Sequence, residues 1–258
     1  MRAQFSLLLA ILIFIGTTPV MAQTVFSSCG VKGSTTLYDL SSNRWVMTDQ
    51  ADADRQTLPA STFKIFHSLI ALDTGATTLG EVFEWDGVER EFPIWNEDTT
   101  LEDAFRNSTI WVYEELANRI DHSTYQRYLH WADYEGNGDI EHGQDSNFWV
   151  YGAFGISPKD QIAMLVSLYK NELPFSRQSM NIVKSFMKED ENTYGKTGWT
   201  QQDGTHIGWW VGYRETSVGP IFFATRLTKP ESENLGNFLE CRKQITNVLI
   251  NEYLKNGH

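Results

Sequence analysis

The sequence is poor in cysteine and in positive charge. Its only two cysteines among 258 residues, Cys29 and Cys241, belong to no Cys-x-x-Cys or Cys/His cluster, which argues against a zinc site. In an oxidising compartment they could pair as a disulfide, or both could stay as buried thiols. Lys and Arg number 21 against 33 Asp and Glu, a formal net charge of −12. Because such a chain repels phosphate groups, we expect no nucleic-acid partner.

Other absences narrow the chemistry further. The sequence has no Gly-x-Ser-x-Gly elbow, no His-Glu-x-x-His pattern, no P-loop and no Gly-x-Gly-x-x-Gly. Its six histidines, among them His67, His122 and His206, are scattered without ligand spacing. No internal repeat and no Pro-rich or Gly/Ser-rich linker divides the chain. We therefore expect one domain over residues 23–258, with no bound metal.

The longest apolar run lies at the N-terminus. Arg2 is followed by an apolar run over 7–16, which is too short to span a membrane comfortably. Ala22 then offers a small residue where a signal peptidase would cut. An uncleaved anchor is the less favoured alternative. We expect residues 1–22 to be a signal peptide and the mature chain to be secreted, to the periplasm, without a stable membrane span.

Strand and helix patterns occur in blocks along the chain. Residues rich in β-branched and aromatic side chains predict strands at 34–40, 43–48, 194–200, 207–214 and 221–227. Helical spacing or helix-start signals predict helices at 61–73, 100–117, 157–169, 176–187 and 234–254. Gly75 should end the first helix, and Asp203-Gly204 is a turn signal. This order predicts an α+β fold: a mainly antiparallel sheet from both chain ends, flanked by helices, with an inserted helical subdomain at approximately 76–175.

The first candidate for chemistry is Ser61-Thr62-Phe63-Lys64. If Ser61 begins a helix, Lys64 lies one turn along on the same face. A serine hydroxyl becomes a good nucleophile when a base takes its proton, and burial lowers a lysine pKa enough to make it such a base. The N–H groups of the helix N-terminus would stabilise developing negative charge. Taken alone, Ser-x-x-Lys is more often a solvated helix face.

Two further segments are weak when taken alone. Lys196-Thr197-Gly198 falls in a predicted strand, where the lysine could steer an anionic substrate and Gly198 would allow close approach to the backbone. A lysine on a surface strand is the more frequent explanation. Ser108 is expected inside the helix at 100–117, where a serine usually bonds only to its own backbone.

The order of these segments carries more weight than any one of them. Ser-x-x-Lys, an internal serine and Lys-Thr-Gly before a final strand pair is the layout of penicillin-recognising serine enzymes. In finer detail the chain resembles the class D β-lactamases (oxacillinases) over nearly all of its mature length. The resemblance rests on 59–65 (PASTFKI), 68–72 (SLIAL), 83–87 (FEWDG), 95–96 (WN), 148–149 (FW), 156–157 (IS), Gln161 and 208–212 (GWWVG).

This resemblance implies hydrolysis of β-lactam antibiotics through an acyl-enzyme on Ser61. Lys64 would take up CO2 on its side-chain nitrogen, and the carbamate would be the general base in both half-reactions, with no separate cofactor. Trp149 would hold the carbamate through its indole N–H, and Ser108 would help pass a proton to the leaving nitrogen. Lys196 would lie near the substrate carboxylate.

The resemblance also assigns groups that bind the substrate. Thr197 and Gly198 belong to the strand beside the small-molecule β-lactam, and the backbone N–H of Trp199 would complete an oxyanion hole with that of the nucleophile. Arg242 would pair with the β-lactam carboxylate. Ile110 stands where the family usually has valine, which narrows the roof of the carbamate pocket.

One loop departs from the family pattern, and two other activities share the motif set. The family's Tyr-Gly-Asn motif appears here as residues 134–137 (YEGN), with one extra residue, so Tyr134 receives no catalytic role. A penicillin-binding sensor would stay acylated without turnover, and a peptidase-like or catalytically dead binding protein is a third interpretation. Lys64 together with Trp149 favours hydrolysis, and the expected signal peptide favours a free enzyme. The sequence leaves open whether this enzyme is a monomer or a homodimer.

Overall fold

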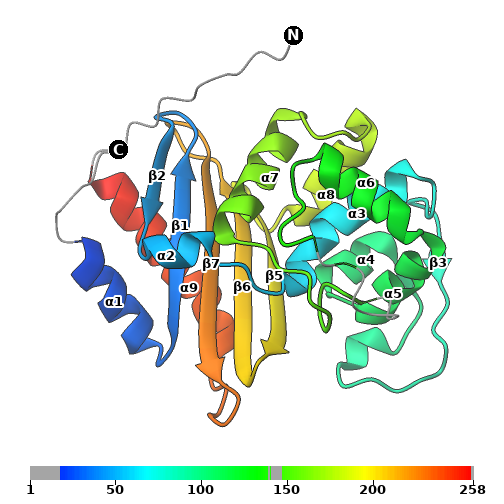
Figure 1. Cartoon of the computed structure of the whole chain (residues 1–258), viewed down its shortest axis with the longest axis horizontal. Coiled ribbons are helices and arrows are strands. Elements are labelled where there is room, and N and C mark those ends of the chain that lie inside the picture. Colours follow the sequence, from blue (N-terminus) through cyan, green and yellow to red (C-terminus); the bar gives the residue numbers. More distant parts are fainter. Residues whose placement is uncertain (1–17, 139, 141–146, 257–258) are drawn as a thin grey trace.

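A five-stranded antiparallel sheet forms the centre of the computed structural model, which describes residues 18–138, 140 and 147–256. The strands lie in the order β2-β1-β7-β6-β5. Their bounds are β1 (Lys32–Asp39), β2 (Arg44–Met47), β5 (Thr193–Gln202), β6 (Thr205–Arg214) and β7 (Ile221–Pro230). Figure 1 shows helices on both faces of the sheet and a group of helices beside its β5 edge. The predicted α+β fold is confirmed.

Strands from both ends of the chain meet in this sheet. β1 pairs with β7, so that Leu37 lies opposite Phe223, and β6 lies between β7 and β5. The turn from β5 to β6 is Asp203-Gly204, with φ of 51° and 72°. Two successive positive φ values match the twist of a tight hairpin, as the sequence predicted. β5 is left as an edge strand facing the helical group.

Alternate side chains of β7 face two different helical layers. Ile221 and Phe223 pack in one cluster with residues of α9 (Phe238–Lys255). Phe222 and Ala224 belong to the large core that also contains the apolar face of α7 (Pro158–Lys170). Since side chains of a strand alternate between faces, a sheet covered on both sides needs a continuous apolar run, which this strand has.

The helical group begins with the segment that contains Ser61. A 3₁₀ turn, Ala60–Phe63, leads into α3 (Lys64–Asp73), and Gly75 follows with φ of 72°, the left-handed residue that was expected to end the helix. The start signals at Thr100 and Ser157 are confirmed, and Ser176 begins a third helix in the same way, because each side chain accepts a backbone N–H of the next helix. The remaining elements are α1 (Thr18–Ser28), α2 (Gln50–Asp54), α4 (Leu101–Arg106), α5 (Ile110–Arg119), α6 (His122–Trp131), α8 (Arg177–Met187), β3 (Val82–Phe83), β4 (Thr99–Thr100) and a 3₁₀ turn at Pro93–Trp95.

The helix expected over 100–117 is wrong as a single helix. α4 ends at Arg106, and Ser108 adopts φ of 57° instead of lying mid-helix. The N–H of Ser108 bonds to Phe105 O and that of Thr109 to Ala104 O, the paired bonds of a Schellman ending. Glycine or asparagine usually marks this position, so the serine gave no signal of a break. α9 likewise starts at Phe238 rather than at residue 234.

A disulfide joins Cys29, just after α1, to Cys241 on α9, with 6.2 Å between the Cα atoms. This bond decides between the two states that the sequence left open. Residues 1–17 of the expected signal peptide lie outside the described residues, and the expected cut after Ala22 falls within α1. Among residues 18–138, 140 and 147–256, no helix has the length and apolar character needed to cross a bilayer.

Candidate active site

Ser61 lies in a tightly held turn between the sheet and the helical group. The residue before it, Ala60, is fully buried and has φ of 51°, a conformation that side chains other than glycine rarely adopt. Its N–H donates to Trp149 O at 2.9 Å, and Thr62 Oγ1 donates to Pro59 O at 2.6 Å. A strained backbone persists only where its surroundings hold it, and here those bonds also bring Trp149 against the turn.

Hydrogen bonds to side chains of the sheet hold the chain just before this turn. Trp209 Nε1 donates to Leu58 O at 2.9 Å, and Leu58 N donates to Gln202 Oε1 at 3.1 Å. A methyl group added at Gly198 would lie 2.9 Å from Pro59 O and 3.2 Å from Ser61 N. Only glycine lets β5 run this close to Ser61. The sequence predicted close approach of a ligand to Gly198, whereas the near neighbour in the structure is the backbone around Ser61.

Lys64 occupies an aromatic chamber and has no hydrogen-bond partner. Its side chain is fully buried, and its Nζ lies 4.2 Å from the ring centre of Tyr113 and 6.0 Å from that of Trp149. The indole Nε1 of Trp149 is also buried without a partner. Burial, and then the positive charge of Lys196, holds the pKa of Lys64 well below its ordinary value against the attraction of Glu114. An uncharged primary amine at this position is a nucleophile and a base.

A second buried base, His67, adjoins the same chamber. Its ring packs edge-on against Trp149 and Tyr113, with ring centres 5.0 and 5.1 Å apart. Nε2 shares a hydrogen bond with Tyr125 OH at 2.5 Å, while Nδ1 is buried without a partner. Burial lowers the pKa of His67 well below its ordinary value, so the imidazole is neutral. The sequence gave His67 no role, although it follows Lys64 by one helical turn.

Lys196 and Ser108 meet across the gap between β5 and the helical group. Lys196 Nζ donates to Ser108 Oγ at 2.5 Å and to Thr197 O at 3.1 Å, and lies 5.5 Å from the ring centre of Phe105. Burial, and then the charge of Arg242, lowers the pKa of Lys196 to about 7. A group with that pKa can hold or release a proton near neutral pH. The left-handed backbone of Ser108 therefore brings its hydroxyl to a lysine on the opposite subdomain.

Arg242 reaches the same strand from α9. Its Nη1 donates to Gly198 O at 2.7 Å and its Nε to Leu239 O at 2.6 Å, while burial lowers its pKa to about 10. Thr197 and Trp199 are half-buried on β5, and Trp199 Nε1 has no partner. Because β5 is an edge strand, some of its backbone N–H groups face away from β6 toward the site.

Ile110 is the first residue of α5 and packs half-buried against the large core. It lies one helical turn before Tyr113, whose ring covers Lys64 Nζ. The structure thus brings together Ser61, Lys64, Trp149, Lys196, Ser108, Gly198 and Arg242. Sequence reasoning missed Tyr113, Phe105 and His67. Only the one-turn spacings of Tyr113 from Ile110 and of His67 from Lys64 could have indicated them.

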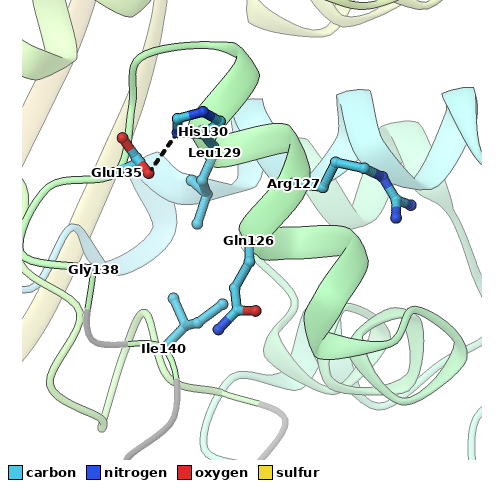
Figure 2. A pocket seen from close by; sticks show the side chains of 7 residues that line it. All are labelled: Gln126, Arg127, Leu129, His130, Glu135, Gly138 and Ile140. Atoms are coloured by element: carbon cyan, nitrogen blue, oxygen red, sulfur yellow. Dashed lines mark hydrogen bonds and ion pairs between the residues drawn. The ribbon is translucent and has the colours of Figure 1, made fainter.

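Hydrogen bonds connect the 134–137 loop, which carries the extra residue, to the segments beside Ser61. Tyr134 OH donates to Gln161 Oε1 at 2.9 Å, and Gln161 Nε2 donates to Thr62 Oγ1 at 2.7 Å, next to Ser61. Asn137 donates to Ala153 O at 2.7 Å and accepts from Gly155 N at 2.9 Å. The inserted Glu135 points outward to His130 (Figure 2), with 3.0 Å between Oε1 and Nδ1.

A surface hollow of about 410 Å³ lies beside α6, and Figure 2 shows the side chains that line it. Its lining residues are Gln126, Arg127, Leu129, His130, Glu135, Gly138 and Ile140. None of them belongs to the group around Ser61, and the polar members are exposed. The chemistry is therefore concentrated at the boundary between β5 and the helical group.

Comparisons with known proteins point in one direction. Residues 33–247 match the family described as penicillin binding protein transpeptidase domain. The chain is 40% identical over 212 residues to Beta-lactamase OXA-3 of Pseudomonas aeruginosa, covering 80% of this chain and 75% of that one. It is similar to the crystal structure of class D beta-lactamase from Sebaldella termitidis, with a TM-score of 0.84, 34% identity, and coverage of 90% of this chain and 95% of that chain.

A regulatory protein also shares the sequence pattern. Regulatory protein BlaR1 of Bacillus licheniformis is 30% identical over 210 residues, which make up 79% of this chain but 34% of that protein. The similarity therefore covers only about a third of BlaR1. The similarity to the β-lactamases covers most of both chains.

Proposed function

The chain belongs to the class D β-lactamases and is a serine hydrolase of β-lactams; we propose that its acyl-enzyme forms on Ser61, with carboxylated Lys64 as the general base. One observation carries this proposal. Lys64 Nζ and Trp149 Nε1 are both fully buried without partners, one helical turn from a serine held in a strained turn. Buried polar atoms without partners are rare and mark places where another group binds.

The residues around Lys64 fit a carboxylate derived from CO2. Only an uncharged amine reacts with CO2, and burial keeps Lys64 in that form. A carboxylate on Nζ needs a hydrogen-bond donor nearby. The indole N–H of Trp149 can be that donor, since it has no acceptor among the described residues. When present, that carboxylate supplies a general base for both acylation and deacylation.

Ser61 would attack the lactam carbonyl carbon. The new bond from Ser61 Oγ places negative charge on the carbonyl oxygen, which backbone N–H groups can stabilise. The N–H of Ser61 lies beside Gly198 on the edge strand, and the N–H of Trp199 is the partner donor in this proposal. The bonds that hold Ala60 and Leu58 fix this geometry before substrate arrives, so little reorganisation is needed.

Ser108 and Lys196 would deliver the proton that the leaving nitrogen needs. When the lactam C–N bond breaks, that nitrogen gains a proton. The Ser108 hydroxyl is placed to pass it on, since Lys196 Nζ donates to Ser108 Oγ. With a pKa of about 7, Lys196 can replace this proton near neutral pH. Its positive form, with Arg242 and Thr197, also favours the carboxylate that β-lactams carry.

Turnover separates this function from the alternative of a sensor that stays acylated. The test is to mix the mature protein with a chromogenic cephalosporin, with and without bicarbonate, while following both product formation and intact mass. We expect repeated turnover that rises with bicarbonate and a transient adduct that Ser61→Ala abolishes. A stable adduct after a single burst would establish a sensor or a penicillin-binding protein. No adduct in wild type would contradict serine acylation.

We also propose export of the mature chain, from residue 23, to the periplasm. The Cys29–Cys241 disulfide supports this, because such bonds persist in oxidising compartments. N-terminal sequencing of the protein recovered from a periplasmic extract should start at Gln23. Recovery of the uncut chain in the membrane fraction would contradict the cleavage.

A further inference from the structure

Within the part of the chain that the structure describes, three polar atoms around the Lys64 chamber lack hydrogen-bond partners, and the proposed mechanism uses two of them. Lys64 Nζ and Trp149 Nε1 are two, and His67 Nδ1 is the third. Lys64 and His67 are three residues apart on α3, so both side chains project from the same face of the helix. The rings of Tyr113 and Trp149 contact both of them. His67 therefore adjoins the chamber directly.

The hydrogen bond to Tyr125 decides which nitrogen of His67 carries the proton. Within the described part of the chain, the Tyr125 hydroxyl has His67 Nε2 as its one hydrogen-bond partner. If Nε2 donated, the phenol proton would be buried without an acceptor, which is costly. Tyr125 OH therefore donates to Nε2. A neutral imidazole has one proton, so that proton is on Nδ1, which is a donor without an acceptor.

Among the described residues, the two side chains that adjoin Lys64 in the chamber, Trp149 and His67, consequently both present donors. Trp149 Nε1–H can only donate, His67 Nδ1–H donates in the tautomer that Tyr125 selects, and Lys64 Nζ carries N–H groups. Aromatic rings of Phe63, Tyr113 and Phe148 fill the surroundings. A fully apolar shell would not keep three unmatched donors, because each costs free energy in a low-dielectric interior. The arrangement suits an anionic acceptor with two oxygens.

We propose that His67 is a positioning residue that donates, through Nδ1–H, to the carboxylate formed on Lys64, and so sets the affinity of Lys64 for CO2. This inference rests on the proposed function. In the reaction the Nζ amine attacks the carbon of CO2, an N–C bond forms, one C=O electron pair moves to oxygen, and Nζ releases one proton to solvent. The product carries one negative charge on two oxygens, for which Trp149 and His67 are the donors.

The substitutions at His67 separate hydrogen bonding from packing. His67→Leu removes the donor. His67→Asn keeps an N–H close to the position of Nδ1, because the asparagine amide nitrogen overlies it. Tyr125→Phe leaves the imidazole in place but frees its tautomer. His130→Leu is the matched control, since His130 is exposed and bonds to Glu135.

Occupancy of Lys64 is read directly by ¹³C NMR of the mature protein titrated with ¹³C-labelled bicarbonate. A signal that Lys64→Ala abolishes is assigned to the modified lysine. We expect His67→Leu to raise the bicarbonate concentration at half-saturation about tenfold, as loss of one hydrogen bond to a charged group requires. His67→Asn should stay within about threefold of wild type, with Tyr125→Phe between them and His130→Leu unchanged. Thermal unfolding confirms that each variant is folded.

The outcomes distinguish failure of the proposed role of His67 from failure of the proposed function. Equal half-saturation in wild type and His67→Leu would overturn the role of His67 and leave the proposed function intact. An equal loss in His67→Leu and His67→Asn would also overturn it, because packing alone would then explain the effect. No lysine signal in wild type at saturating bicarbonate would overturn both.

Discussion

Two fully buried basic side chains, Arg226 on β7 and Lys64 in the chamber, have opposite surroundings. Arg226 Nη2 contacts Asp52 Oδ1 at 2.6 Å and Asp52 O at 2.9 Å, and its Nη1 donates to Arg55 O at 2.7 Å and to Thr57 Oγ1 at 3.0 Å. Burial alone would raise the pKa of Asp52, but the charge and hydrogen bonds of Arg226 outweigh it and lower that pKa. Both groups therefore stay ionised.

Among the described residues, Lys64 Nζ has no hydrogen-bond partner, and no carboxylate pairs with it. The rings of Tyr113 and Trp149 lie near its Nζ, and the charges of Lys196 and Glu114 act on its pKa in opposite directions. A buried amine without partners has a lowered pKa, so it loses its proton and stays buried. The presence or absence of partners therefore separates two roles. Arg226, which is paired with Asp52, stabilises the fold, whereas the amine of Lys64, which has no partner, stays reactive. Ser108 and Ala60, with their left-handed backbones, belong to the second kind of site.

The largest effect should follow removal of the amine. Lys64→Met keeps the volume of the side chain and removes the base, so we expect turnover of a chromogenic cephalosporin to fall about 10³-fold or more. The free energy of unfolding should be unchanged or higher, because a poorly solvated amine is replaced by an apolar group. Steady-state kinetics and urea unfolding measure the two quantities. A marked loss of stability with turnover retained would break the comparison.

Arg226→Met should show the reverse pattern. It leaves Asp52 as a buried carboxylate whose main partner is gone, which costs about 3–5 kcal/mol of unfolding free energy. Turnover per folded molecule should change far less than in Lys64→Met. Adding Asp52→Asn should recover part of the lost stability in a double-mutant cycle. A loss of less than about 1 kcal/mol in urea unfolding would show that this pair is not structural.

The disulfide gives a reference for stability that is remote from the chamber. Replacing Cys29 and Cys241 with serine removes a cross-link between positions 212 residues apart. We expect a loss of about 2–4 kcal/mol of unfolding free energy. Turnover at low temperature should be largely retained, because Cys29 and Cys241 pack in a small cluster separate from the large core around Lys64, although Arg242 directly follows Cys241. Turnover that falls in proportion to stability would mean that α9 and Arg242 depend on this link.

Lys196 should produce a smaller, pH-dependent effect. Its pKa is about 7 in the folded protein and higher when unfolded, so between these values the unfolded chain binds more protons. Stability from this group is therefore lowest below pH 7 and rises with pH above 7, by about 1 kcal/mol from pH 7.5 to 8.5. Lys196→Met should lose that slope in urea unfolding. An identical slope in both proteins would contradict a depressed pKa of Lys196. Arg226 should contribute nothing to the change of stability with pH in this range.

The sequence predicted those parts of the fold that depend on local patterns. The strands, the helix starts at Thr100 and Ser157 and the turn at Asp203-Gly204 follow from periodicity, capping residues and turn residues. The break at Ser108 could not be predicted, because a serine takes the left-handed position that glycine usually marks. In that conformation Ser108 meets Lys196, 88 residues away, and no local pattern encodes this contact.

For the site, the sequence gave the candidate residues but not their surroundings. The resemblance indicated Ser61, Lys64 and Trp149, and the structure brings them together. The ring of Tyr113 over Lys64 and the pairing of His67 with Tyr125 arise from packing between separate helices. A lone histidine in a helix is more often structural, so only the missing partner of Nδ1 distinguishes it.

The most direct test of the account is whether turnover depends on CO2 through Lys64. The mature protein is degassed at mildly acidic pH to remove CO2, returned to pH 7.5 in CO2-free buffer, and assayed with a chromogenic cephalosporin before and after bicarbonate is added. If carboxylated Lys64 is the general base, we expect turnover to be largely lost and then to recover with bicarbonate, while Lys64→Met shows neither change. Full turnover in CO2-free buffer, in protein shown by NMR to lack the modified lysine, would contradict it.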